Sequence, residues 1–363
     1  MSINEIIMYI MVLFMALGAL DRCLGNKFGL GAKFEEGINA MGDLALSMVG
    51  IMILAPIIAK LLSPIVVPVY KFLGADPSMF ATSLIAIDMG GYQLAQQMAL
   101  NTQAGMFAAV ILGSMMGPTI VFTIPVALGI IRKEDHRFLA MGVLAGMITI
   151  PIGCFVGGLV MGLPLMMILR NLVPIIIFAV LIALGLWKIP EKMIHGFAIF
   201  GKFIVWIGTI GLALGAVQSM IGKKLLPGMD NVQPAIQTVG GIALTLSGAF
   251  TLVYVITKVF KKPLMKLGKV LGMNDISAAG LIASLANNIP MFEMMKDMDD
   301  RGKVINVAFA VSAAFVFGDH LGFVAGVAKS MIFPMIVGKL VAGITAIFVA
   351  MFIADKMLKK KAK

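Results

Sequence analysis

Apolar runs of about twenty residues recur along the whole chain, and each is long enough to cross a bilayer as an α-helix. Hydrophobic residues fill 60% of the 363 positions, and charged residues fill only 13%. Eleven such segments occur, near residues 3–20, 43–62, 78–99, 104–131, 138–163, 165–187, 194–221, 234–260, 276–295, 304–330 and 333–354. The sequence therefore predicts an all-α polytopic membrane protein.

The net charge of +11 is carried by short basic clusters between the apolar segments and by the tail "DKMLKKKAK". This distribution is typical of loops that face the inner leaflet, and it argues against a nucleic-acid partner. Cys23 and Cys154 form no metal-binding spacing, and no P-loop or GxSxG pattern occurs. The sequence predicts no metal, no cofactor and no catalytic residue.

The second half of the chain resembles the first. At an offset of 198, Gly50 aligns with Gly248, and "KFLGAD" from Lys71 aligns with "KVLGMN" from Lys269. At an offset of 200, "DMGGYQLA" aligns with "NIPMFEMM", and at 201 "MMGPT" aligns with "VFGDH". Matching interruptions of apolar segments are typical of transporters built from two repeats. We predict a first repeat at 1–164, a linker helix and loop at 165–190, and a second repeat at 191–363.

Counts of Lys and Arg test the topology, because cytoplasmic loops carry an excess of both. If all eleven segments cross the membrane, the two sides hold 13 and 13. If the segments at about 76–102 and 275–301 are broken or re-entrant helical hairpins, the counts become 21 and 5. The hairpins also make the second repeat inverted relative to the first. This arrangement predicts an outside N-terminus, a cytoplasmic C-terminus and hairpin tips that meet near the midplane; full crossings of both segments remain the alternative.

A charge inside a bilayer costs at least about 2.5 kcal/mol, so an intramembrane carboxylate is expected to face a cavity or a partner. In the first hairpin Asp88 stands beside two glycines that can open a helix. The substrate-binding candidates there are Asp88, Gly90, Gly91, Tyr92 and Gln93. Alternatively, Asp88 caps the second arm of the hairpin.

The second hairpin supplies Asn287, Asn288, Phe292 and Glu293 as further substrate-binding candidates. Alternatively, the two asparagines cap a broken helix and Glu293 pairs with Lys296.

Asp319 and His320 are adjacent within an apolar segment, where such a pair can bind a cation or relay protons. Alternatively, the two side chains bond to each other or to nearby backbone. The predicted helix-break residues are Gly117, Pro118, Thr119, Pro290 and Gly318.

Four stretches, "MYIMVLFMALGALDRCLGNKFGLGAKFEEG", "DMGGYQLA", "NNIPMFEMM" and "FGDHLGF", resemble the ethanolamine permeases of bacterial ethanolamine-utilisation operons, the EutH family. The resemblance covers the whole chain and implies uptake of ethanolamine across the inner membrane, to feed a lyase housed in a microcompartment. Protonated ethanolamine needs a carboxylate or an aromatic face for its ammonium group and a hydrogen-bonding group for its hydroxyl. The candidates supply all of these groups.

We therefore interpret the chain as a permease in contact with ethanolamine and the lipid bilayer. Two alternatives stay open: an intramembrane enzyme acting on a lipid head group, and a cation or proton channel. Coupling to protons or sodium, and assembly into a homo-oligomer, are left open.

Overall fold

A computed structural model describes residues 1–361, apart from the side chains at 260, 261, 264, 267 and 357–361. Over these residues all regular structure is helical, and no strand occurs. Residues 362 and 363, the end of the predicted second repeat, lie outside the described residues.

The helices can be listed on the two sides of α10, with the elements before it called the first half and those after it the second half. The first half contains α1 (Ile3–Cys23), α2 (Leu30–Leu44), η1 (Ala45–Val49), α3 (Gly50–Phe72), α4 (Ser78–Leu84), η2 (Ile87–Met89), α5 (Gly91–Met98), α6 (Thr102–Met106), η3 (Phe107–Leu112), α7 (Met116–Pro118), η4 (Thr119–Thr123), α8 (Ile124–Ile130), η5 (Lys133–Asp135) and α9 (His136–Val160). After α10 (Leu165–Lys188), the second half contains α11 (Pro190–Ile221), α12 (Val232–Val270), α13 (Asp275–Ala286), α14 (Ile289–Met294), η6 (Met295–Asp297), α15 (Asp300–Ala313), α16 (Asp319–Val327), η7 (Lys329–Met331) and α17 (Ile332–Lys361).

Seven helices of the described chain are long and apolar enough to cross a membrane, and an eighth span results if the bent pair Thr102–Leu112 and Met116–Ile130 counts as one. The prediction of an all-helical polytopic membrane protein is confirmed. The spanning helices are fewer than the eleven predicted apolar segments, because two of those segments form the pairs of short helices α4–α5 and α13–α14. In addition, α15 and α16 are separated by a break and have only 14 and 9 residues.

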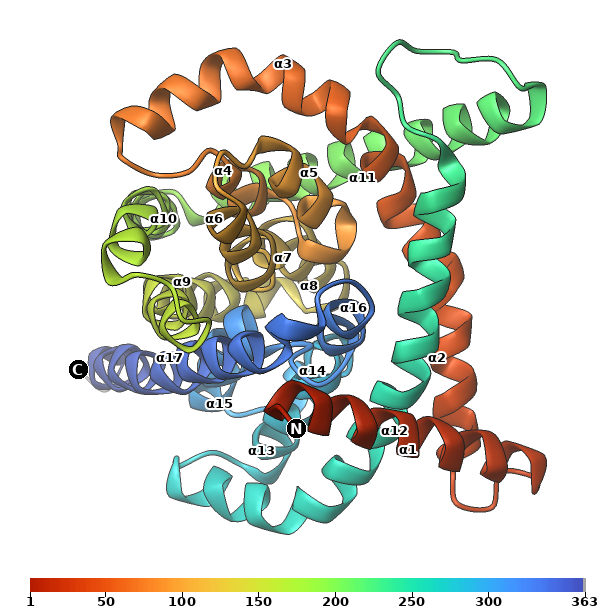
Figure 1. Ribbon diagram of the computed structural model, residues 1–363. Coiled ribbons are helices and arrows are strands. Elements are labelled where there is room, and N and C mark those ends of the chain that lie inside the picture. Colours follow the sequence, from red (N-terminus) through yellow and green to blue (C-terminus); the bar gives the residue numbers. More distant parts are fainter. Residues whose placement is uncertain (362–363) are drawn as a thin grey trace.

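The helices form two groups (Figure 1). In the first, α2 and α12 pack along each other, and α1 packs against both. In the second, α9, α15 and α17 pack against one another. Close crossing in the first group depends on a missing side chain, because a Cβ at Gly37 of α2 would lie 2.4 Å from the Ser247 backbone of α12.

The segment containing α4 and α5 turns back on itself. Asp76 precedes α4, and its Oδ2 accepts hydrogen bonds from the backbone N–H groups of Leu100 (3.0 Å) and Asn101 (2.9 Å), which follow α5. Its Oδ1 accepts from the N–H and hydroxyl of Ser78, at 2.9 and 2.6 Å. The two ends of this segment are therefore held together by one buried carboxylate.

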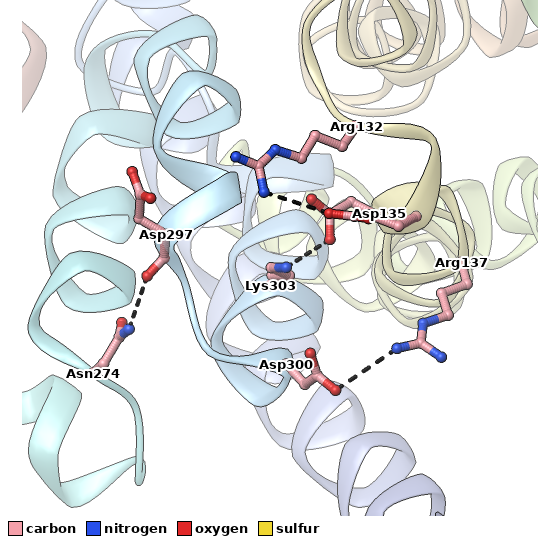
Figure 2. A network of polar contacts seen from close by, with 8 residues as sticks. Arg132, Asp135, Arg137, Asn274, Asp297, Asp300 and Lys303 are labelled. Atoms are coloured by element: carbon pink, nitrogen blue, oxygen red, sulfur yellow. Dashed lines mark hydrogen bonds and ion pairs between the residues drawn. The ribbon is translucent and has the colours of Figure 1, made fainter.

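The segment containing α13 and α14 is closed in the same way. Here the carboxylate belongs to the far end: Asp299 accepts from the backbone N–H of Asn274 (2.9 Å) and the hydroxyl of Ser277 (2.8 Å). The Asn274 side chain also donates to the backbone carbonyl of Asp297 at 3.1 Å (Figure 2). Both segments are hairpins whose ends meet.

Each hairpin tip packs against a break in the helix that follows it. In the first half the backbone N–H of Ile87 donates to Gly113, just before α7, at 2.9 Å. In the second half the N–H of Phe315, between α15 and α16, donates to Ser284 at 3.0 Å. The open backbone groups of the tips and of the breaks thus satisfy one another, as burial away from water requires.

A polar network joins the two halves at one end of the molecule (Figure 2). The buried carboxylate of Asp135, before α9, lies 2.6 Å from the Nζ of Lys303 on α15. Two more exposed ion pairs flank it, Arg132–Glu134 at 3.4 Å and Arg137–Asp300 at 3.8 Å.

Candidate functional site

A cavity of about 790 Å³ lies between the two hairpin tips and α2. The first tip contributes Asp88 and Met89, and the second contributes Asn287 and Ile289. Asp319, at the start of α16, lines the same space. The structure thus brings together three predicted site residues that are far apart in the sequence.

Asp88 is positioned by a short irregular turn. It lies in η2, where Gly90 follows with a φ of +88°, a conformation that glycine adopts without steric cost. A Cβ at Gly90 would also lie 2.4 Å from the side chain of Ile51. Asp88 does not cap the second arm of the hairpin, because α5 begins at Gly91 and no side chain caps its first turn. The half-buried Asp88 carboxylate lines the cavity instead.

Asp319 is the first residue of α16, where the helix dipole favours a negative charge. Its carboxylate is close enough to Asp88, Glu36 and Asp43 for their charges to repel it. A bound cation would relieve this repulsion.

Three more acids line the cavity from one face of α2, namely Glu35, Glu36 and Asp43. Glu35 pairs with Arg22 at 3.2 Å and Glu36 with Lys33 at 2.5 Å, and all three acids are exposed. No Lys or Arg of the described chain lines the cavity. Such a one-sign lining attracts cations towards the deeper Asp88 and Asp319.

The other lining groups suit a small cation that also carries a polar group. The rings of Phe122 and Phe250 offer apolar and cation–π surface. The side chains of Asn39, Asn287 and Ser47 offer hydrogen-bond donors and acceptors. The cavity therefore offers partners for an ammonium group and for a hydroxyl or amide group.

A fully buried lysine lies behind the first tip. The Nζ of Lys339 on α17 donates to the backbone carbonyl of Ser114, in the break before α7. Lys339 does not line the cavity. Its side chain therefore satisfies an open backbone group of the break.

The two neighbouring asparagines differ in role. Asn287 lines the cavity, and its Oδ1 accepts from the backbone N–H of Ile289 at 2.9 Å. Asn288 is buried and donates to the hydroxyl of Thr123, on η4 of the other half, at 2.9 Å. Asn288 therefore ties the second tip to the first half.

Gly90, Gly91 and four other predicted binding residues also lie outside the cavity lining. Tyr92 packs edge-on against Phe323, with 5.8 Å between the ring centroids. Gln93 lines a separate cavity of about 300 Å³ with Asp230 of the α11–α12 connection. Phe292 is buried elsewhere and Glu293 is exposed. The side chain of Glu293 forms no ion pair with Lys296 among the described residues.

His320 is buried beside Asp319, with its ring centroid 5.1 Å from that of Phe315. Its Nδ1 has no hydrogen-bond partner among the described residues.

The predicted helix-break residues lie at the breaks or close to them. A Cβ at Gly117 would lie 2.2 Å from the Ile85 carbonyl oxygen, and one at Gly318 would lie 2.1 Å from that of Ala286. Gly91 is also closely packed in the first tip, since a Cβ added there would lie 2.5 Å from the carbonyl oxygens of Ile85 and Ala86.

The other three shape the neighbouring helices. Pro118 ends α7, and Pro290 stands in the first turn of α14. The Thr119 hydroxyl lies within donating distance of the carbonyls of Met115 (2.9 Å) and Val311 (3.0 Å).

Sequence reasoning missed the acids of α2 and Lys339. The signal for the acids was present, because residues 35, 36, 39, 40 and 43 lie on one face of a helix. The expected apolar segments end at residue 20 and resume at 43, whereas α2 occupies much of the stretch between them. Lys339 is a single cation within the apolar segment 333–354, and its sequence context gives no sign of its contact with Ser114.

Comparisons with known proteins agree on one family. The family described as "Ethanolamine utilisation protein, EutH" matches residues 3–353. A protein of Listeria monocytogenes, named "Probable ethanolamine permease EutH", is 68% identical over all of this chain and 98% of its own length. A protein of Escherichia coli with the same name is 54% identical, over 98% of this chain and 97% of its own length. No solved structure matches the chain.

Proposed function

Because the chain belongs to the EutH family, we propose that it is a permease that carries ethanolamine across the bacterial inner membrane. One observation carries the proposal: the hairpin tips of both halves meet at a cavity lined by five carboxylates and, within the described chain, by no Lys or Arg. Ethanolamine is a cation at neutral pH, and the relatives named as probable permeases extend over nearly the same length. The chain is therefore a transporter in this account, rather than an enzyme.

The site divides into groups for the two ends of the substrate. Asp88 and Asp319 bind the ammonium group, and Phe122 or Phe250 covers its methylene side. Asn287 of the second tip receives the hydroxyl. Glu35, Glu36 and Asp43 line the approach and raise the local concentration of the cation.

The site residues that lie outside the cavity serve its construction. Gly117 and Gly318 allow the backbones of tip and break to touch, whereas Gly90 lets the first tip approach Ile51 of α3 and Gly91 leaves room within the tip itself. Asn288 joins the two halves through Thr123. His320 keeps the role of a proton relay to Asp319, supported by its position next to that carboxylate and by its unpartnered Nδ1 among the described residues.

We propose two inverted repeats, 1–164 and 191–363, joined by the segment 165–190. Paired close approaches support this: Gly50 of α3 meets the Gly208 carbonyl of α11, and its sequence mate Gly248 of α12 meets the Met11 carbonyl of α1. Gly117 with Ile85, and Gly318 with Ala286, form a second pair at the offset of 201. The recurrence of corresponding contacts at offsets of 198 and 201 is expected of repeats that differ by short insertions.

The charge distribution orients the proposed carrier. With 21 Lys and Arg on one side and 5 on the other, the N-terminus lies outside and the C-terminus in the cytoplasm. The acidic cavity begins near the predicted inside connection between α1 and α2, where Arg22 pairs with Glu35 and Lys33 with Glu36, so this account takes the structure as an inward-facing state.

The smaller cavity with Gln93 marks the outside path. The two paths are separated along one helical run, since Leu44 and Ser47 line the acidic cavity, whereas Met52 and Ile53 line the other. Movement of the tips against this run would expose the site alternately.

Uptake of labelled ethanolamine by the purified chain in liposomes tests the proposal. We expect saturable uptake, competition by unlabelled ethanolamine, and recovery of unmodified ethanolamine inside. A chemical product formed without uptake would support the lipid-head-group enzyme instead. Uptake that rises linearly with concentration, without saturation, would support a channel.

A further inference from the structure

A second large cavity lies at a different place in the molecule. Its volume is about 960 Å³, and it is enclosed by the start of α9, the end of α10 and the start of α11. Its polar lining includes Lys133, His136, Arg137 and His195, beside the ring of Trp187. None of these residues lines the acidic cavity.

An apolar groove of about 530 Å³ continues from this cavity between α9 and α10. Leu144 and Trp187 line both spaces, so the two are adjacent. The rest of the groove is lined by aliphatic and proline side chains, namely Ile148, Pro151, Ile176, Ala179, Val180, Ala183 and Leu184.

The lining follows one face of each helix over a considerable length. On α9 the lining positions 137, 140, 141, 144, 148 and 151 recur at spacings of three and four, as one helical face requires. At 1.5 Å per residue, residues 137 and 151 are about 21 Å apart along the axis. The hydrocarbon half of one leaflet is about 15 Å deep. The cavity and the groove together thus reach from the polar interface to near the centre of the membrane.

Positive charge gathers at the polar end. In the stretches 132–137 and 187–195, five Lys and Arg stand against three acids, and one of the acids, Asp135, is bonded to Lys303. Glu134 is paired with Arg132 and Arg137 with Asp300 at 3.8 Å, whereas Lys133 has no ion-pair partner among the described residues. Glu191 is the other acid in the lining.

From this juxtaposition we propose that the cavity and groove bind one anionic phospholipid of the inner leaflet. Its phosphate contacts Lys133 and Arg137, the two histidines donate further hydrogen bonds, and one acyl chain lies along the groove between α9 and α10. Basic pockets between transmembrane helices at the cytoplasmic side suit such head groups. A soluble anion would leave the apolar continuation unexplained. A neutral lipid would leave the excess of Lys and Arg in these stretches, and the Lys133 side chain that forms no ion pair among the described residues, without a counter-charge.

Binding of phosphatidylglycerol and phosphatidylcholine to the purified full chain in detergent, followed by native mass spectrometry, tests the proposal. We expect at least fivefold more retained phosphatidylglycerol than phosphatidylcholine. The double variant Lys133→Gln, Arg137→Gln should lose this preference. The matched control Lys223→Gln, Lys224→Gln removes two exposed charges from the α11–α12 connection and should keep it. Ala183→Phe, which fills the groove and leaves every charge, should lower retention at least fivefold.

Several results would overturn the proposal. Equal retention of the two lipids, or full retention by the double variant, would contradict recognition of the head group. Competition by glycerol 3-phosphate as effective as that by the lipid would identify a site for soluble phosphates. If the double variant does not fold, Lys133→Gln alone decides, because its side chain forms no ion pair among the described residues.

Discussion

Asp88 is the residue on which substrate binding depends most in this account. It lies in the turn of the first hairpin and faces a cavity that contains no basic side chain of the described chain. Asp88→Asn keeps the shape and removes the charge. A hydrogen bond to a charged group contributes about 1.5–3 kcal/mol, so we expect kcat/KM for ethanolamine uptake to fall about 10- to 100-fold. Initial uptake rates over a range of ethanolamine concentrations measure this.

The control for Asp88→Asn is Asp275→Asn, which removes the same charge from an exposed position in the first turn of α13. Uptake by this variant should stay within about twofold of wild type, because a surface charge outside the cavity contributes little. Equal losses in both variants would mean that overall charge, and not the site, determines uptake.

At this scale the sequence identified the residues whose chemistry conflicts with their surroundings. Asp88 and Asp319 are acids within apolar segments, and the structure places both in the cavity. Sequence alone could not separate Asn287 from Asn288, since one faces the cavity and the other faces Thr123. Glu293 is also an acid within a predicted apolar segment, yet its side chain is exposed. The direction of a side chain near a helix break depends on tertiary packing.

Among the helical elements, the contact between each hairpin tip and its break leaves no space for a methyl group. A Cβ at Gly318 would lie 2.1 Å from the Ala286 carbonyl oxygen, so Gly318→Ala must push the second tip away from α16. Overpacking of this kind costs about 1–3 kcal/mol. We expect a lower thermal unfolding temperature and loss of most uptake.

Gly129→Ala is the matched control, because nothing lies within 4 Å of a Cβ at Gly129 in α8. Alanine also favours a helix over glycine, so this variant should be as stable as wild type or more stable. If Gly318→Ala were as stable and as active as Gly129→Ala, tip and break would not need to touch.

At the level of elements, charge counting predicted the two hairpins. The hydrogen bonds that Asp76 and Asp299 accept show that the ends of each hairpin meet. The boundaries of the long helices were harder to predict. Residues 30–72 form one helical run through α2, η1 and α3, although hydropathy separates its polar start from its apolar middle. In the same way α12 continues to Val270, although the predicted apolar segment ends at residue 260 and a lysine-rich stretch follows it. Amphipathic ends of helices remain helical without being apolar.

At the scale of the molecule, the buried pair Asp135–Lys303 joins the two halves. Lys303→Met would leave the Asp135 carboxylate buried without its partner, which costs about 3–5 kcal/mol. Adding Asp135→Leu should recover most of this loss, because the charge is then removed as well. Thermal unfolding of the purified variants measures both effects. Arg132→Gln breaks the exposed neighbouring pair with Glu134 and should cost less than about 1 kcal/mol. A Lys303→Met variant as stable as this control would contradict the role of the pair.

The orientation of the molecule follows from charge counting and can be tested by labelling. Gln103 is exposed near the hydrogen-bonded ends of the first hairpin, and Lys296 is exposed near those of the second. In a Cys23→Ser background, which removes the exposed native cysteine, Gln103→Cys should react with an impermeant maleimide on intact cells. Lys296→Cys should react only after permeabilisation. Labelling of both from the same side would rule out inverted repeats.

The most direct test of the central claim is counterflow in liposomes that contain the purified chain. Vesicles loaded with unlabelled ethanolamine and diluted into labelled ethanolamine should accumulate label transiently above equilibrium, because a carrier exchanges substrate through one site that opens alternately. The same vesicles with Asp88→Asn should show little or no overshoot. Label that only equilibrates in wild type, or an overshoot of wild-type size in Asp88→Asn, would contradict a carrier that binds ethanolamine in the acidic cavity.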